Sequence, residues 1–379
     1  MKTPIMFFPL ILVMAIFSYK NGKGEEAHNL SIHGDDSLHS LDSPIRAQTA
    51  PNNPIELGKV NWYRNLDEAM SVAKRQNKPV FILFQEVPGC STSSGYGRNV
   101  LSHPLIIDAI ETLFVPVAIY NNEGGDDRKT LEAFGEPSWN NPVVRIITPE
   151  RKELAPRLNG DYSQKGLVNT IIQALKENDQ PVPTYLQIFS EELNSRNSSL
   201  EKATFAMHCF WEGEANIGNL NGVISTNPGY MNGYEVVEVE FNPSVISFSE
   251  IVEKAKHRDV ANKVFFQDEA QRKTANNLLG ENSVSRIETF RTDNDPKHYL
   301  SRTSYRYVPM TSLQASRVNS AIAGGLSPEG SLSPSQLELH EFIKNHPGYD
   351  WHNSVASNDF TMAWNTAMTM VTNHYDERI

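Results

Sequence analysis

The sequence predicts an α/β domain followed by an α+β domain, behind an N-terminal segment that belongs to neither. Continuous apolar runs of strand length alternate with helix-periodic segments in the first half, which is typical of strands buried between helices. In the second half, an alternating strand precedes a helix-capping signature. The chain is 39% hydrophobic, which is enough apolar material for folded domains.

Charge and cysteine content exclude several classes of function. The 379 residues include 34 Lys and Arg against 45 Asp and Glu, a formal charge of −11. Affinity for nucleic-acid backbones comes from clustered cations, and no basic stripe occurs, so no nucleic-acid partner is expected. The two cysteines are too few for a four-cysteine zinc site or a disulfide-dense scaffold. Any sulfur chemistry therefore runs through Cys90, Cys209 or both.

The N-terminal residues have the pattern of a targeting segment. A charged start precedes an apolar run from Ile5 to Phe17, and polar residues follow. The 13 residues of this run fall short of the roughly 20 that a membrane-spanning helix needs. We therefore interpret 1–20 as a signal peptide or N-terminal anchor and 21–55 as a disordered spacer. An exported protein, periplasmic or secreted, is expected, with no membrane contact beyond that anchor.

The first domain is predicted over 56–180. Apolar residues spaced three and four positions apart from Leu66 to Ala73 mark one face of a helix. The run Val80–Phe84 is a strand buried on both faces, and Cys90 follows it closely. Further strands are predicted over 113–119 and 142–147, and a closing helix over 168–175.

The position of Cys90 favours a redox role. It lies on the turn between a strand and a helix, where the positive end of the helix dipole favours the thiolate. Its neighbours in 89–95 are small and polar, which does not suit a core position. The alternative is a buried and inert thiol, which is a common state of free cysteines.

The tract Val80–Tyr162 resembles the thioredoxin superfamily, and within it a family marked by Val-Pro-Gly followed by cysteine or selenocysteine. The resemblance implies that Pro142, at the start of the third strand, is cis and lies beside the redox cysteine. Ser93 stands where such sites have their second cysteine. A site of this form attacks oxidised sulfur, but it cannot release its own mixed disulfide.

The second domain is predicted over 183–379. The segment Tyr234–Phe241 alternates between apolar and charged residues, as a half-exposed strand does. Ser247 and Glu250 form a capping box for the helix that follows. Two more helices are predicted near the C-terminus, starting after Thr311 and Ser333.

Residues 203–255 resemble the A-type peptide methionine sulfoxide reductases, whose fold is a ferredoxin-like α/β fold. Four elements recur in order: Cys-Phe-Trp, Gly-Val, Gly-Tyr, and a Glu that leads a strand ending Phe-Asn-Pro-Ser. The resemblance implies that Cys209 is the nucleophile and that Glu235 is the acid that protonates the sulfoxide oxygen. It also implies a substrate pocket formed by Phe210, Trp211, Tyr230 and Tyr299.

The chemistry explains why a cysteine, a carboxyl group and aromatic rings belong together. Protonation of the sulfoxide oxygen makes its sulfur electrophilic, so the thiolate needs a neutral acid within hydrogen-bond reach. The alternation puts Glu235 on the face of Val237 and Val239, where we expect partial burial and a raised pKa. Aromatic rings contact the apolar methyl group, and the attack leaves a sulfenic acid that another thiol must resolve.

The sequence departs from that family's pattern at four places. His208 replaces the usual glycine before the nucleophile. The loop before the acid is shortened and lacks an active-site tyrosine, a role for which Tyr234 is the candidate. Asn294 stands at the position of a late aspartate, whose role is left to Asp293 or Asp295. No cysteine follows the nucleophile.

These residues predict thiol-dependent reduction of methionine sulfoxide in proteins or peptides. Each domain lacks the second cysteine of its relatives and supplies one, so Cys90 is expected to resolve the sulfenic acid on Cys209. No bound cofactor is expected, and an external thiol, thioredoxin-like or small, would supply the electrons. His340, His346 and His352 recur at intervals of six, which matches no metal-ligand pattern, so no metal is expected.

Three alternatives stay open. In the first, the second domain is a catalytically degenerate module that binds methionine-containing or oxidised peptides. In the second, the chain is a thiol–disulfide oxidoreductase that acts through Cys90 alone. In the third, the two cysteines form a permanent structural disulfide, which an oxidising compartment would allow.

Overall fold

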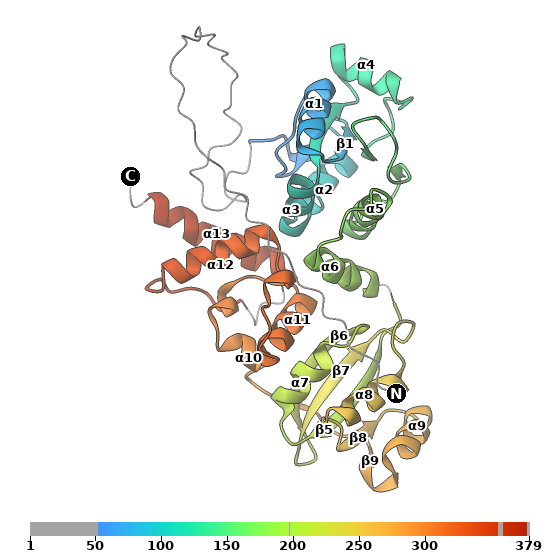
Figure 1. Cartoon of the computed structure of the whole chain (residues 1–379), viewed down its shortest axis with the longest axis vertical. Coiled ribbons are helices and arrows are strands. Elements are labelled where there is room, and N and C mark those ends of the chain that lie inside the picture. The colour runs from blue at the N-terminus through green and yellow to red at the C-terminus, as the bar shows by residue number, and fades with distance from the viewer. Residues whose placement is uncertain (1–51, 197, 355–358, 377–379) are drawn as a thin grey trace, which may run out of the picture. The chain divides into compact units, whose positions relative to one another are not determined.

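A computed structural model describes residues 52–196, 198–354 and 359–376 (Figure 1). The predicted signal segment 1–20 and nearly all of the predicted spacer lie outside these residues. Within the described part, no helix combines the length and the apolar character that crossing a membrane requires.

The first sheet has the strand order β2-β1-β3-β4. Its strands are β1 (Val80–Gln85), β2 (Val115–Tyr120), β3 (Val143–Ile147) and β4 (Leu158–Asn159). β1 pairs in parallel with β2 and antiparallel with β3, and β3 pairs antiparallel with β4. The three strands expected from apolar runs are confirmed, although β2 begins at Val115 because Leu113 still belongs to the preceding helix.

Helices cover both faces of this sheet, so every residue of β1 is buried. They are α1 (Leu66–Gln76), α2 (Ser91–Asn99), α3 (Pro104–Leu113), α4 (Gly125–Ala133), α5 (Gln164–Glu177) and α6 (Thr184–Ser195). Alternation along β1 sends Phe81 and Leu83 into one core, which α3, α5 and α6 complete. Val80, Ile82 and Phe84 enter a second core with α1 and α4. The predicted helices around residues 66–73 and 168–175 are α1 and α5.

The second sheet has the strand order β10-β6-β7-β5-β8-β9. Its strands are β5 (Glu201–Met207), β6 (Val223–Met231), β7 (Tyr234–Phe241), β8 (Lys263–Phe266), β9 (Val284–Arg286) and β10 (Arg291–Thr292), and its helices are α7 (Phe210–Gly218), α8 (Phe248–His257) and α9 (Glu269–Leu279). β7 pairs antiparallel with both β5 and β6. It has the bounds that its alternating sequence predicts, and the capping box that starts α8 is confirmed.

α7 and α8 pack over one face of this sheet (Figure 1). Val237, Val239 and Phe241 of β7 enter the core that these helices share with the sheet. Val236 is buried as well, in a small cluster with Phe265 on the other face. Val236, Glu238 and Glu240 therefore point to this second face of the sheet, where Val236 is buried.

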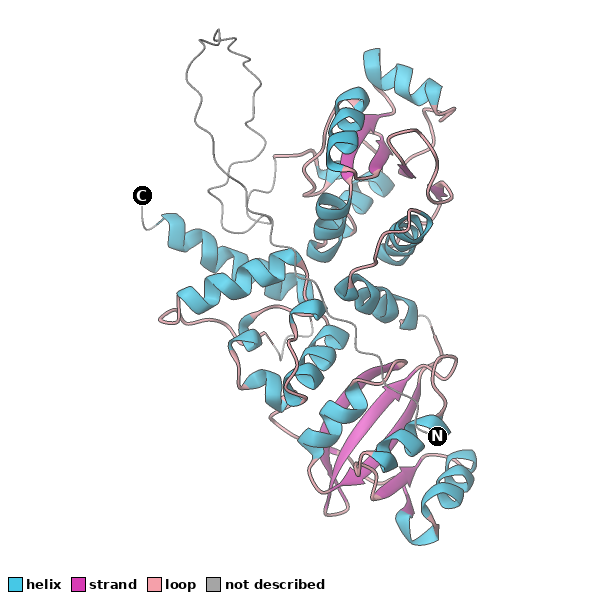
Figure 2. Ribbon diagram, viewed as in Figure 1, coloured by secondary structure: helices cyan, strands magenta, loops and turns pink. Residues whose placement is uncertain are grey.

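The C-terminal residues are mostly helical (Figure 2), and their helices share a further hydrophobic core. These helices include α10 (His298–Ser301), η4 (Ser304–Tyr307), α11 (Ser312–Ala323), α12 (Pro334–Asn345) and α13 (Phe360–Asp376). The side chains of Thr311 and Ser333 accept backbone N–H groups three residues ahead and complete the two predicted capping boxes. These caps fix where α11 and α12 begin.

Candidate active site

Cys209 is the N-cap of α7, where the chain leaves β5 and turns over the sheet. Its side chain is half-buried. The next residue, Phe210, donates its backbone N–H to Oε2 of Glu235 at 2.9 Å. Glu235 reaches this helix end because it lies opposite Met207, the last residue of β5, in the β5–β7 pairing. The fold therefore brings the expected nucleophile and the expected acid to one helix end.

Aromatic rings gather beside this pair. The Phe210 ring lies 5.4 Å from the Trp211 ring and 5.2 Å from the Tyr230 ring, measured between centroids. Tyr230 is directly opposite Glu235 in the β6–β7 pairing, and directly opposed residues share one face of a sheet. Three of the expected pocket residues thus lie together at the expected acid.

Tyr299 reaches the same site from α10. Burial, and then the negative charges of Cys209 and Glu212, raise the pKa of Tyr299. A raised pKa keeps the phenol protonated, so its hydroxyl remains a hydrogen-bond donor near the thiol. The fourth expected pocket residue is therefore close to the nucleophile.

Sequence reasoning did not find the partner of Trp211. The imidazole of His298 stacks on the indole, with the ring centroids 3.7 Å apart and the planes at 11°. Nδ1 of His298 lies 2.7 Å from a carboxylate oxygen of Asp295, whose other oxygen accepts from the Ser301 hydroxyl at 3.0 Å. Asp295 thus orders α10 through two side chains, whereas the one hydrogen bond of the Asp293 carboxylate among the described residues is from the backbone N–H of Asp295.

A buried ion pair links α10 to α7. Nζ of Lys297 lies 2.6 Å from one oxygen of Glu214, and the backbone N–H of Lys297 donates to the other oxygen at 2.7 Å. The Glu214 side chain is fully buried, and Lys297 has a positive φ of 55°. Glu214 lies four residues after Phe210, which is one helical turn along α7. This spacing, which places both residues on one face of the helix, is the one feature of the sequence that indicates Glu214.

The structure does not bring Tyr234 to the site. Met231 and Tyr234 close a two-residue hairpin whose turn residues, Asn232 and Gly233, have φ of 48° and 78°. Successive side chains of a strand point to opposite faces, so Tyr234 and Glu235 diverge. The Tyr234 ring instead contacts Phe265, 6.0 Å away, on the other face. The expectation that Tyr234 replaces the missing tyrosine is therefore wrong.

Cys90 is the N-cap of α2 and is exposed. The backbone N–H of Ser93, and then its hydroxyl, lower the pKa of the Cys90 thiol. The Ser93 hydroxyl lies 3.7 Å from the sulfur and donates to Oδ1 of Asn141 at 2.6 Å. Asn141 precedes Pro142, and the bond between them is cis. Ser93 therefore links Cys90 to the residue before Pro142, whose peptide bond is cis as the resemblance implies, and exposed Cys90 is not the buried thiol of the alternative.

Two carboxylates that sequence reasoning missed hold the Cys90 turn. Glu56 is buried and accepts from the backbone N–H of Gly89 at 3.0 Å and from the Ser94 hydroxyl at 3.2 Å. Glu86 accepts from the backbone N–H of Cys90 at 3.2 Å. Glu56 belongs to the short helical turn Ile55–Leu57, far before the cysteine in the sequence. No local sequence pattern therefore indicates that Glu56 contacts the Cys90 turn.

Two of the three spaced histidines stack on aromatic rings. His340 stacks on Tyr305 with centroids 3.7 Å apart, and His346 stacks on Phe342 at 4.1 Å. In the part of the chain that the structure describes, no group of three or more His, Cys, Asp or Glu side chains is arranged to hold a metal ion.

Comparison with known protein families gives a match for the first domain. Residues 61–149 match a family model described as thioredoxin-like. This part of the chain is a thioredoxin-like domain. The parallel β1–β2 pair and the antiparallel β1–β3 pair form the centre of the sheet of this thioredoxin-like domain, and Cys90 follows its strand β1.

The chain is also similar to peptide methionine sulfoxide reductases. It is 37% identical over 73 residues to MsrA of Geobacter sulfurreducens and 32% identical over 78 residues to MsrA 1 of Nostoc sp., stretches that cover 15% and 16% of this chain. They cover 45% and 48% of those proteins, so the chain spans about half their length. MsrA of Saccharolobus solfataricus is 25% identical over 183 residues, which are 38% of this chain and 99% of that protein.

Proposed function

We propose that this chain reduces methionine sulfoxide in proteins or peptides. The observation that carries the proposal is the hydrogen bond from the Phe210 N–H to Glu235, which fixes a carboxyl group at the helix end where Cys209 lies. The Cys209 thiolate attacks the sulfoxide sulfur while Glu235 protonates the oxygen. A sulfur–sulfur bond forms first, and this bond and the methionine sulfur–oxygen bond then break as a sulfur–oxygen bond forms on Cys209. Transfer of the hydroxyl to Cys209 then leaves a cysteine sulfenic acid and the thioether, so cysteine is oxidised by two electrons and methionine sulfur is reduced by two.

The pocket residues divide the remaining work. The rings of Phe210, Trp211 and Tyr230 contact the methyl group, because thioether and methyl groups are apolar and sulfur–aromatic contacts are favourable. The Tyr299 hydroxyl donates a second hydrogen bond to the sulfoxide oxygen, since its raised pKa keeps it protonated. These roles need no bound cofactor.

Cys90 completes the cycle in this proposal. Its thiolate attacks the sulfur of the Cys209 sulfenic acid, which forms a Cys90–Cys209 disulfide and releases water. An external thiol then reduces the disulfide by two electrons. Two features support the role: Cys90 is exposed with a lowered pKa, and it is the only other cysteine in the sequence.

The N-terminal sequence pattern supports export of the protein. Sequencing the N-terminus of the mature protein tests this proposal.

Mass spectrometry tests the cycle directly. One equivalent of a methionine sulfoxide peptide is added to reduced protein without other thiols, and we expect a peptide pair joined through Cys90 and Cys209. In Cys90→Ser, dimedone should label Cys209 instead, because the sulfenic acid has no resolving thiol. Normal turnover of Cys90→Ser with a thioredoxin-like donor would overturn the resolving role, and no oxidation of Cys209 would overturn the reaction.

The two-residue β6–β7 turn supports a second candidate function. It replaces the segment that carries another active-site tyrosine in the resembling family, so the domain would bind methionine-containing peptides without turnover. Consumption of substrate above a Cys209→Ser control counts against this candidate.

An oxidoreductase that acts through Cys90 alone gives a different result. Disulfide reduction would persist in Cys209→Ser, and the wild type would not reduce sulfoxides.

A further inference from the structure

A cavity of about 460 Å³ lies beside η4 in the C-terminal helical part. Three cationic side chains and three aromatic rings line it: Arg302, Arg306, Lys344, Tyr307, Tyr349 and Trp351. The chain as a whole carries a formal charge of −11, so a concentration of cations around one cavity runs against its overall charge. Cations and aromatic rings together favour an anionic organic group.

The charges of this cavity are unequally compensated. Arg302 pairs with Asp295 at 2.9 Å, and Lys344 pairs with Glu341 at 2.5 Å. Arg306 is half-buried, and among the described residues its guanidinium contacts only neutral partners, the Ser301 carbonyl, the Tyr307 hydroxyl and the Tyr307 ring. A partly desolvated cation gains most from an anionic partner. The cavity therefore offers the Arg306 charge to a ligand.

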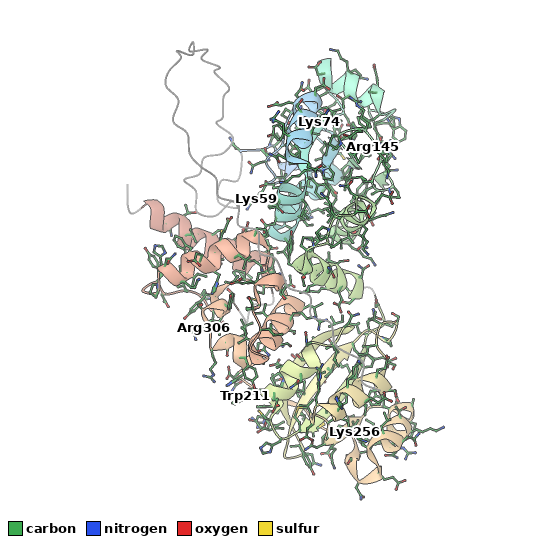
Figure 3. All side chains as sticks on the ribbon, in the orientation of Figure 1. Lys59, Lys74, Arg145, Trp211, Lys256 and Arg306 are labelled. Carbon is green, nitrogen blue, oxygen red and sulfur yellow. The ribbon has the colours of Figure 1, made fainter. Side chains whose placement is uncertain are left out.

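The same cavity adjoins the reductase-like site. Nε of Arg302 donates to Nε2 of His298 at 3.4 Å, and His298 stacks on Trp211 of the proposed substrate pocket. Figure 3 labels Trp211 on α7 and Arg306 on η4, the two ends of this connection. His298 and Arg302 are one helical turn apart, about 6 Å along α10. An extended peptide advances about 3.3 Å per residue, so about two residues cover the turn from His298 to Arg302. Arg306 lies four residues farther along the chain, in η4, which adds up to about 8 Å at the rise of a 3-10 turn, so three to five peptide residues reach it from the pocket.

We propose that this cavity is a substrate subsite that binds a carboxylate about three to five residues from the methionine sulfoxide of a peptide. The proposal rests on the proposed function, since it assigns a preferred substrate to that site. The carboxylate pairs with Arg306, and the rings of Tyr349 and Trp351 pack against the peptide. The preferred substrates are then oxidised methionines in acidic, extended segments.

Peptide binding tests the subsite without any turnover. Fluorescein-labelled peptides carry one methionine sulfoxide and either Asp or Asn at three, four or five residues on either side, and they are titrated into Cys209→Ser protein by fluorescence polarisation. We expect the Asp peptide to bind roughly tenfold more tightly than its Asn partner at one of these positions. Peptides with a free or an amidated C-terminus show whether a main-chain carboxylate serves as well.

Two substitutions locate the effect. Arg306→Gln should abolish the preference for Asp, whereas Arg306→Lys keeps the charge and should retain part of it. Arg286→Gln is the matched control, because Arg286 is an exposed cation of β9 outside the cavity and should keep the full preference. Equal affinity for Asp and Asn peptides at every position, or equal effects of the Arg306 and Arg286 substitutions, would overturn the proposal. If Arg306→Gln does not fold, the peptide comparison and Arg306→Lys decide.

Failure of the subsite and failure of the proposed function give different results. If wild-type protein reduces Asp and Asn peptides with equal kcat/KM, the subsite is wrong and the reductase function stands. If wild-type protein reduces neither peptide and yet binds the Asp peptide through Arg306, the reductase function is wrong and the subsite stands.

Discussion

Ser93 occupies the position at which a second redox cysteine is expected, and the structure gives it a different task. Its backbone N–H and hydroxyl lower the pKa of Cys90, and its hydroxyl also ties the turn to Asn141. A serine cannot form an internal disulfide, so it activates the thiol without being able to resolve it. In the proposed cycle, Ser93 therefore favours the Cys90 thiolate and leaves its resolution to an outside partner.

Replacement of Ser93 by Ala should raise the pKa of Cys90, because the Ser93 hydroxyl, one of the groups that stabilise the thiolate, is lost. A cysteine is alkylated as its thiolate, so the wild type should react with iodoacetamide at a lower pH than Ser93→Ala. The measurement follows the alkylation rate against pH in a Cys209→Ser background, where Cys90 is the only thiol. Ser91→Ala is the control, and a shift as large in that variant would contradict the role of Ser93.

Glu235→Gln should lower kcat by about 10²–10⁴-fold with little change in KM, because glutamine cannot protonate the sulfoxide oxygen. Its side-chain oxygen still accepts the Phe210 N–H, so the helix end stays in place. Glu238→Gln, three positions after Glu235 in the same strand and paired with Lys202 at 3.1 Å, is the matched control. Steady-state kinetics with a methionine sulfoxide peptide decide, and similar kcat values for the two variants would remove Glu235 from the reaction.

At the scale of elements, α10 is a helix of one turn that depends on α7 for its position. The Lys297–Glu214 ion pair fixes its start, and the His298–Trp211 stack fixes its face. Tyr299 directly follows these two anchors, so its place near Cys209 follows from the contacts of its two preceding neighbours. A short helix has little stability of its own, so tertiary contacts must supply it.

Lys297→Met should lower the free energy of unfolding by about 3–5 kcal/mol, because it leaves the buried Glu214 carboxylate without its cation. It should also raise KM for the peptide, because Lys297 fixes the start of α10, and α10 carries Tyr299 of the proposed pocket. Urea denaturation and peptide kinetics measure the two effects. The double variant Glu214→Gln/Lys297→Met should regain part of the stability, because no buried charge is left unpaired. A single variant as stable as the wild type would contradict the argument.

At the scale of the whole molecule, the two cysteines could form either a transient disulfide during catalysis or a permanent structural disulfide. The stability of the protein distinguishes these two cases. Both thiols are free, and each is the N-cap of a helix that follows a strand. A permanent disulfide would stabilise the fold mainly through the unfolded state, and its loss typically costs about 2–5 kcal/mol. A transient disulfide would leave the stability of the resting protein almost unchanged.

Cys90→Ser should change the free energy of unfolding by less than about 0.5 kcal/mol, because an exposed thiol contributes little to packing. The comparison uses protein purified without added reductant, so that any standing disulfide is preserved. A loss in the range expected for a disulfide, with unchanged sulfoxide reduction, would favour the structural staple over the resolving role.

The local features of this fold could be predicted because their causes are local. Val80–Phe84 is a strand because its apolar run must be buried on both faces, and Tyr234–Phe241 is a strand because its side chains alternate. The three capping boxes formed as expected, since each involves residues three positions apart. The place of Cys90 at a helix start depends on the same short-range signals.

The sequence by itself determined three strands of the first sheet, strand β7 of the second, the three caps and the helix start at Cys90. Only the tertiary structure decided that Glu214 meets Lys297, that His298 covers Trp211 and that Glu56 holds the Cys90 turn. It also turned Tyr234 away from the site, since a two-residue hairpin fixes which face each strand residue takes. Contacts between distant segments depend on how elements pack, and no period or spacing along the chain encodes that packing.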